Sequence, residues 1–286
     1  MEKLKYLIKL LRPSQWIKNF FVFGAMLFSN NFMNYKILKD NIITFIAFCF
    51  ISSTVYILND IIDIEKDRNH PKKCKRPIAS GKVSIFNATI LGILLLMLSL
   101  YISFSINKFL VIIILLYFLN NIVYSLKIKN IILLDVISIS IGFILRVLSG
   151  GFATGVKVSD WIILCTFFLS LFLGLGKRRN ELIVLGEDAQ NHRKNLSQYN
   201  LEFLNKLISI VLTCTIIFYA IYSVLGAPAN HFVWTNIAVI VGILRYYYLM
   251  YYKQEGGSPT ELVLKDKQIM FSVVLWIFSC ALILNI

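Results

Sequence analysis

Between two apolar segments of the chain, residues 59–82 read NDIIDIEKDRNHPKKCKRPIASGK. Within this stretch Asn59, Asp60, Asp63 and Asp67 have helical spacing, and at about 100° per residue they fall within an arc of roughly 100°. Three carboxylates on one helix face repel one another unless a cation lies between them. Hard oxygen ligands without His or Cys suit Mg²⁺, usually together with substrate phosphates. The spacing therefore predicts that these four residues hold Mg²⁺.

Basic residues follow the acids directly. They are Lys72, Lys73, Lys75, Arg76 and Lys82. Lysine offers a compact charge and arginine a planar fork, and both bind phosphate oxygens. A solvated helix end with scattered charges is the alternative interpretation, but scattered acids rarely share one face. Metal ligands next to phosphate-binding cations indicate a substrate that carries a diphosphate.

The overall composition places this stretch in a membrane protein. Of the 286 residues, 58% are hydrophobic and only 15% are charged, a balance that is rare in soluble domains. Long apolar runs recur along the chain, and they predict an all-α polytopic fold with about nine transmembrane helices. No linker divides the sequence, so we expect a single domain over residues 1–286. The predicted spans are residues 16–33, 41–58, 85–105, 108–126, 131–151, 159–176, 202–226, 232–252 and 268–285.

The net charge of +14 would suit nucleic acid, but the positions of the charges indicate membrane topology instead. With the N-terminus in the cytosol, 21 lysines and arginines fall on cytosolic segments and four on the opposite side. The positive-inside rule therefore predicts a multi-pass protein of the inner (plasma) membrane with a cytosolic N-terminus. The long loops 59–84 and 177–201 then lie in the cytosol, where we expect the active site. Nucleic acid is not an expected partner.

The predicted span 108–126 closes with the sequence NNIVYSLK. In it Asn120, Tyr124 and Lys127 share one helix face by their i, i+4 and i+7 spacing. A tyrosine and a lysine alone would suit an anchor at the membrane interface. Two adjacent asparagines in an apolar span favour a functional role, so Tyr124 and Lys127 are candidate substrate-binding residues.

The predicted span 131–151 contains two ionisable residues, Asp135 and Arg146. Ionisable groups at membrane depth are costly and usually face a polar cavity. Their separation in sequence puts them about 20° apart in rotation but about 16 Å apart along a helix, so we expect no direct ion pair. Asp135 is a candidate group of the metal or phosphate site. For the deeper Arg146, a structural network and an anion site both stay open.

A third basic segment is GLGKRRNE, residues 174–181. Such a run commonly marks the end of a membrane span. Next to an acidic metal site it gains a second meaning, because Lys177 and Arg178 would be placed to bind phosphates.

A fourth basic segment is RPSQWIKN, residues 12–19. On an α-helix Gln15, Lys18 and Asn19 form one polar face by i, i+3 and i+4 spacing, beside a tryptophan that suits the membrane interface. Membrane anchoring and substrate contact by Lys18 are both open.

Together these motifs resemble a known family. NDxxDxxxD between two helices resembles the first aspartate motif of the UbiA superfamily of intramembrane prenyltransferases. The resemblance extends from about residue 12 to residue 270, and it is closest to the decaprenyl-phosphate phosphoribosyltransferase branch. The stretches similar to that branch are DRNHPKKCKRPIASG, YSLKxxxxxxLDV, GFxLRxxxGG, GKRRxE and RPSQWIKN.

This resemblance implies nine transmembrane helices around a cytosol-facing cavity. It implies Mg²⁺-dependent transfer of 5-phosphoribose from 5-phosphoribosyl 1-diphosphate to a polyprenyl (decaprenyl-type) phosphate, with release of diphosphate. It implies that Asn59, Asp60, Asp63 and Asp67 hold Mg²⁺ and the donor, and that Asp60, Asp63 and Asp135 are catalytic. The candidate substrate- or phosphate-binding residues, from the motifs and the resemblance together, are Asn59, Lys18, Lys73, Arg76, Tyr124, Lys127, Arg146, Lys177 and Arg178.

The second acidic motif favours one branch of the superfamily. Members that transfer a prenyl group commonly carry DxxxD there, whereas this chain has Asp135 and then Ile139. An enzyme that moves a prenyl group from a prenyl diphosphate to an aromatic acceptor is therefore the alternative function. A transporter or lipid-binding protein without chemistry is a third hypothesis. A homo-oligomer is possible.

Overall fold

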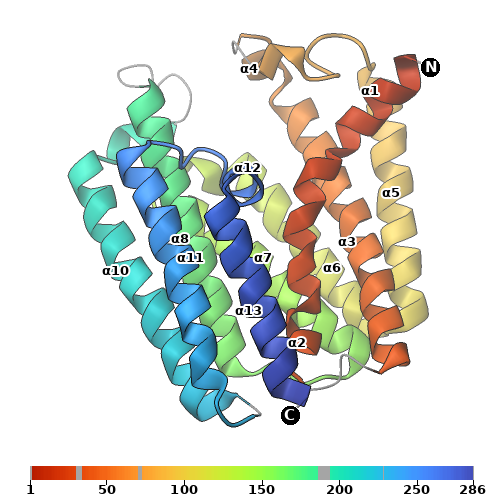
Figure 1. Ribbon diagram of the computed structural model, residues 1–286. Coiled ribbons are helices and arrows are strands. Elements are labelled where there is room, and N and C mark those ends of the chain that lie inside the picture. The colour runs from red at the N-terminus through yellow and green to blue at the C-terminus, as the bar shows by residue number, and fades with distance from the viewer. Residues whose placement is uncertain (1, 30–33, 70–72, 186–193, 228, 286) are drawn as a thin grey trace.

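A computed structural model describes residues 2–29, 34–69, 73–185, 194–227 and 229–285 (Figure 1). All regular structure in these ranges is helical, so the predicted all-α membrane fold is confirmed. Eight helices are long and apolar enough to cross a membrane. They are α3 (Tyr35–Ile62), α5 (Ile85–Ile106), α6 (Lys108–Leu126), α7 (Leu134–Thr154), α8 (Asp160–Leu185), α10 (Leu201–Ile221), α11 (Thr235–Tyr252) and α13 (Lys267–Asn285).

The first predicted span, residues 16–33, is not among these eight helices. Its described part consists of the 3₁₀-helix η1 (Pro13–Phe23) and the short α2 (Gly24–Leu27). Runs of 3₁₀-helix this long are uncommon, and here side-chain bonds to α3 hold the segment in place. Trp16 Nε1 donates to Ser53 Oγ at 3.1 Å, and a hydropathy pattern carries no information about such a contact.

Short elements lie between the long helices. These are α1 (Glu2–Leu11), α4 (Ile64–Arg68), η2 (Lys73–Lys75), η3 (Ile128–Asn130), η5 (Lys194–Gln198), η6 (Tyr222–Gly226), η7 (Phe232–Trp234) and α12 (Pro259–Lys265). The N-terminus, α1 and α4 lie at one end of the bundle and the C-terminus lies at the other (Figure 1). We call the end with α1 and α4 the loop end.

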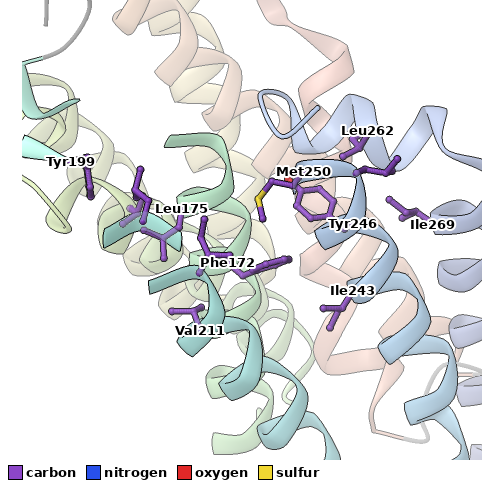
Figure 2. Packing of buried hydrophobic residues seen from close by; sticks show 13 residues of the cluster. Phe172, Leu175, Tyr199, Val211, Ile243, Tyr246, Met250, Leu262 and Ile269 are labelled. Carbon is purple, nitrogen blue, oxygen red and sulfur yellow. The ribbon is translucent and has the colours of Figure 1, made fainter. Parts of the chain in front are cut away.

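Helix α7 joins two groups of packed helices. It contacts α3, α6 and η1 on one side and α8 on the other. Its Val136 belongs to a buried cluster with Phe172 and Tyr246, formed mainly by α8, α10 and α11 (Figure 2). Its Leu145 belongs to a second cluster with Phe48, formed by α3, α6 and η1. The two groups of helices therefore meet along α7, which begins at the loop end.

Close contact between η1 and α7 depends on Gly150. A Cβ atom built there would lie 1.8 Å from the carbonyl oxygen of Val22, which is far inside van der Waals contact. The backbone of η1 can approach α7 this closely because residue 150 has no side chain.

We predict that Gly150→Ala destabilises the protein by about 1–3 kcal/mol or more, because the clash is with backbone and cannot be relieved by a rotamer change. Thermal unfolding in detergent measures the effect. Gly142→Ala, in the same helix, is the control, since the nearest atoms would lie 3.6 Å from its Cβ. Equal unfolding temperatures for the two variants would contradict the packing described here.

Candidate active site

The acidic motif lies at a break between two helices. Helix α3 ends at Ile62, Asp63 is its C-cap with φ −96° and ψ 13°, and α4 begins at Ile64. The prediction of one continuous helix through Asp67 was therefore wrong. The turn at Asp63 allows the following loop to fold back over the acids, while the amide of Asp67 still donates to the carbonyl of Asp63 at 2.8 Å.

Arg76, from the loop that folds back, binds two of the acids with a single nitrogen. Its Nη1 lies 3.1 Å from Asp60 Oδ1 and 2.5 Å from Asp67 Oδ2. Arg12 binds Asp60 from the other side, and its guanidinium lies 4.8 Å from the ring centroid of Tyr56. Both aspartates are only 2% exposed. Two carboxylate oxygens thus converge on one cationic atom.

The other two residues of the motif are held by the end of α6 and by η3. Ser125 donates its hydroxyl to Asn59 Oδ1, and Lys129 Nζ lies 2.8 Å from Asp63 Oδ1. Lys127, the candidate substrate-binding residue of this segment, is exposed. An α-helix continued past Leu126 would have placed these lysines differently, but the chain enters the 3₁₀-helix η3 instead.

The oxygen donors of the motif fit magnesium that is shared with a substrate. Among the described residues, no group of three or more His, Cys, Asp and Glu side chains is arranged to hold a metal by itself. Two carboxylates, however, already converge on the position of one cation. One or two carboxylates together with substrate phosphates is the usual setting of protein-bound Mg²⁺. The site therefore fits a metal that binds together with a phosphate-bearing ligand.

Asp135 is engaged in a second buried network. It is fully buried at the start of α7, and its Oδ2 accepts a hydrogen bond from Arg178 Nε at 2.6 Å. Its Oδ1 accepts one from the Tyr199 hydroxyl at 3.0 Å. Arg178, 1% exposed, also binds Glu181 at 2.5 Å, and Lys177 lies 3.9 Å from the same carboxylate. The structure thus brings three predicted site residues together, with Asp135 as the counter-ion of Arg178.

Tyr199 is a member of this network that the sequence did not reveal. Its hydroxyl accepts the backbone N–H of Leu133 at 2.8 Å, and Leu133 has a positive φ of 65°. Burial and the neighbouring Asp135 charge raise the pKa of Tyr199, so its hydroxyl stays protonated and continues to donate. The residue links the segment after α8 to the start of α7.

The hydrogen-bond partners of Arg146 are neutral groups, and the residue is only 5% exposed. Its Nε donates to Asn19 Oδ1 at 2.9 Å, and its two Nη atoms donate to the carbonyl of Gly142 at 2.7 Å and to the Tyr117 hydroxyl at 2.8 Å. The arginine thus joins α7 to η1 and α6, as the structural-network interpretation predicts.

The predicted polar face of Gln15, Lys18 and Asn19 does not form. The repeat of η1 is three residues, so Asn19 turns with Trp16 toward Ser52 and Ser53 of α3. Lys18 and Gln15 lie on a different face of the 3₁₀-helix.

A cavity of about 980 Å³ opens at the loop end. Its lining includes Lys73 from the first basic loop, Asn180 and Glu181 from the end of α8, and Arg245 and Asp266 from α11 and the start of α13. Asp60 and Asp67 do not line it, because Arg12 and Arg76 pack against them. Lys72 lies outside the described residues. The cavity thus has lining residues from two predicted phosphate-binding segments, the basic loop after Asp67 and residues 174–181 at the end of α8.

Comparison with known proteins agrees with this architecture. The sequence matches the UbiA prenyltransferase family over residues 19–281. Decaprenyl-phosphate phosphoribosyltransferase from Corynebacterium glutamicum is 32% identical, over 95% of this chain and 84% of the relative. The protein of the same name from Mycolicibacterium smegmatis is also 32% identical, over 95% of this chain and 90% of the relative. The predicted resemblance is confirmed.

A solved structure supports the fold. The structure of a UbiA homolog from Archaeoglobus fulgidus bound to DMAPP and Mg²⁺ superposes with a TM-score of 0.76, covers 99% of both chains and has 21% sequence identity.

We predict that the Asp135–Arg178 pair is coupled in stability. Removing one member leaves a buried charge without its partner and costs about 3–5 kcal/mol, whereas replacing both by apolar residues is often close to neutral. Thermal unfolding of Asp135→Leu, Arg178→Met and the double variant in detergent should therefore show recovery in the double variant.

If the double variant loses as much unfolding free energy as the two single variants lose together, the two residues are not coupled. The control is Glu202→Gln, which breaks an exposed pair with Lys206 on α10. It should change the free energy of unfolding by less than about 1 kcal/mol.

Proposed function

The chain belongs to the UbiA prenyltransferase family, and we propose that it transfers 5-phosphoribose from 5-phosphoribosyl 1-diphosphate to a polyprenyl phosphate, releasing diphosphate. One observation supports a donor with a diphosphate group. Asp60 and Asp67 converge on one cationic nitrogen, that of Arg76 in the basic loop. The names of relatives that align over 95% of the chain support phosphoribose as the transferred group.

We propose that Asn59, Asp60, Asp63 and Asp67 hold Mg²⁺ when the donor binds. Bound there, the ion would offset the negative charge of the leaving diphosphate. The cationic side chains of the protein have a second role. Arg76 and Lys129 now neutralise the acids, and they become available to phosphate oxygens when the acids take a metal.

The transfer needs positioning more than a strong base. An oxygen of the acceptor phosphate attacks C1 of the ribose, the bond from C1 to the diphosphate oxygen breaks, and its electron pair leaves with diphosphate. Positive charge develops on the ring, as in other glycosyl transfers. A phosphate monoester is already anionic at neutral pH, so no proton has to be removed. The enzyme accelerates the reaction by holding the acceptor oxygen close to C1 of the ribose and in the right orientation.

We propose a location that matches the two substrates. The polyprenyl tail would lie along the apolar helices in the inner membrane, and the loop end would face the cytosol, where 21 lysines and arginines are placed by the positive-inside rule. Residues 1–286 would act as one catalytic domain, alone or in a homo-oligomer.

Product analysis tests the proposal. Purified protein with labelled phosphoribosyl diphosphate, polyprenyl phosphate and Mg²⁺ should form a lipid-linked ribose phosphate, and a chelator should stop the reaction. If that product is absent and the protein instead joins a prenyl diphosphate to an aromatic acceptor, the alternative family activity is the correct one.

We predict that Asp63→Asn lowers kcat at least about 100-fold, the upper range for disturbing a metal environment, because it removes one negative charge while keeping the side chain's shape. Membrane insertion should be unchanged. Glu65→Gln is the matched control, since Glu65 is exposed on α4 and binds Arg68 at the surface. Full turnover by Asp63→Asn would remove this residue from the proposed site.

A further inference from the structure

The 3₁₀ geometry of η1 places two cations in one row. With a repeat of three residues, Arg12, Gln15 and Lys18 follow one another along one face. Arg12 is at the loop end, where it binds Asp60. The segment then runs away from the loop end toward α2 (Figure 1), which places Lys18 about 12 Å farther along the axis at about 2 Å per residue.

Lys18 lies among positive charges inside the bundle. The side chain is partly buried, and the groups that act on its charge are Arg146 of α7, Arg12 and the Tyr124 ring of α6. Among the described residues, no hydrogen bond or ion pair reaches its ammonium group. Asp60 of α3, which binds Arg12 at the start of this row, is also bound by Arg76. An ammonium kept at membrane depth without a carboxylate is costly, and such groups mark substrate or ion sites.

Tyr56 offers a second donor, at a depth between those of Asp60 and Lys18. It precedes Asp60 by four residues of α3, so it lies about 6 Å farther from the loop end at about 1.5 Å per residue. Arg12 covers its ring, and Arg146 and Arg12 both act on its hydroxyl. Among the described residues the hydroxyl makes no hydrogen bond. Lys18 and Tyr56 thus provide N–H and O–H donors in a region that carries net positive charge.

We propose that Lys18 and Tyr56, with Arg146 behind them, bind the phosphate of the lipid acceptor. This inference rests on the proposed function and adds to it a division of the cations between two substrates. Arg76 and Lys129 serve the donor at the loop end, and Lys18 serves the acceptor on the membrane side. The acceptor oxygen then approaches C1 of the ribose from within the bundle, while diphosphate leaves on the opposite side toward the loop end.

The test is Lys18→Met, which keeps the length of the side chain and removes its charge. The loss of a charged hydrogen bond should raise the KM for polyprenyl phosphate about 10- to 100-fold, with the KM for phosphoribosyl diphosphate changed less than about twofold. Lys18→Arg should restore part of the affinity. Lys206→Met, at an exposed position of α10, is the control and should change neither KM. A rise in the donor KM instead would place Lys18 on the donor and overturn the proposal.

A second measurement separates this proposal from the proposed function, because it needs no turnover. Short-chain polyprenyl phosphate should raise the unfolding temperature of the wild type but not that of Lys18→Met. The unliganded variant should unfold no earlier than the wild type, since the ammonium has no partner to lose. If the wild type transfers no phosphoribose but the lipid still discriminates the two proteins, the site stands and the function fails. Equal shifts for both proteins, or no shift for the wild type, would overturn the site.

Discussion

Asp60 is the residue around which the loop end is assembled. It lies in the last turn of α3, is almost fully buried, and is bound by Arg12 from the N-terminal segment and by Arg76 from the loop after α4. A buried carboxylate without such partners would cost several kcal/mol. Three segments of the chain are therefore held together by one negative charge, and after the turn at Asp63 the chain brings Arg76 back to it.

A second buried carboxylate, Asp135, is also held by partners from distant segments, in the other half of the bundle. Asp135 is fully buried, and both of its oxygens are bound, by Arg178 and by Tyr199. Asp60 and Asp67 converge on a cation that a metal could replace, whereas Asp135 fixes the start of α7 against the end of α8. We propose that the first motif exchanges its cation for a metal, whereas Asp135 forms a buried ion pair with Arg178.

The sequence predicted the membrane helices and singled out the acidic motif because both depend on local patterns. Apolar runs of sufficient length predict spans, and the i, i+4 spacing brings Asp63 to the same side as Asn59. The failures occur where the backbone leaves α-helical geometry. They are the 3₁₀-helix η1, which separates Lys18 from Asn19, and the 3₁₀-helix η3, which brings Lys129, a residue that the sequence did not single out, to Asp63. Two partners of the buried acids were also missed, because Arg12 is 48 residues from Asp60 and Tyr199 is 64 residues from Asp135.

The central claim is that the cations now bound to the first acidic motif give way to a metal and the donor. An experimental structure with phosphoribosyl diphosphate and Mg²⁺ tests this most directly. We predict that the oxygens of Asp60 and Asp67 lie on the ion, with Arg76 turned to the diphosphate and Asp135 still bound to Arg178. The account would be contradicted by a structure in which Asp60 keeps its bonds to Arg12 and Arg76 while the ion and the donor are held by Asp135.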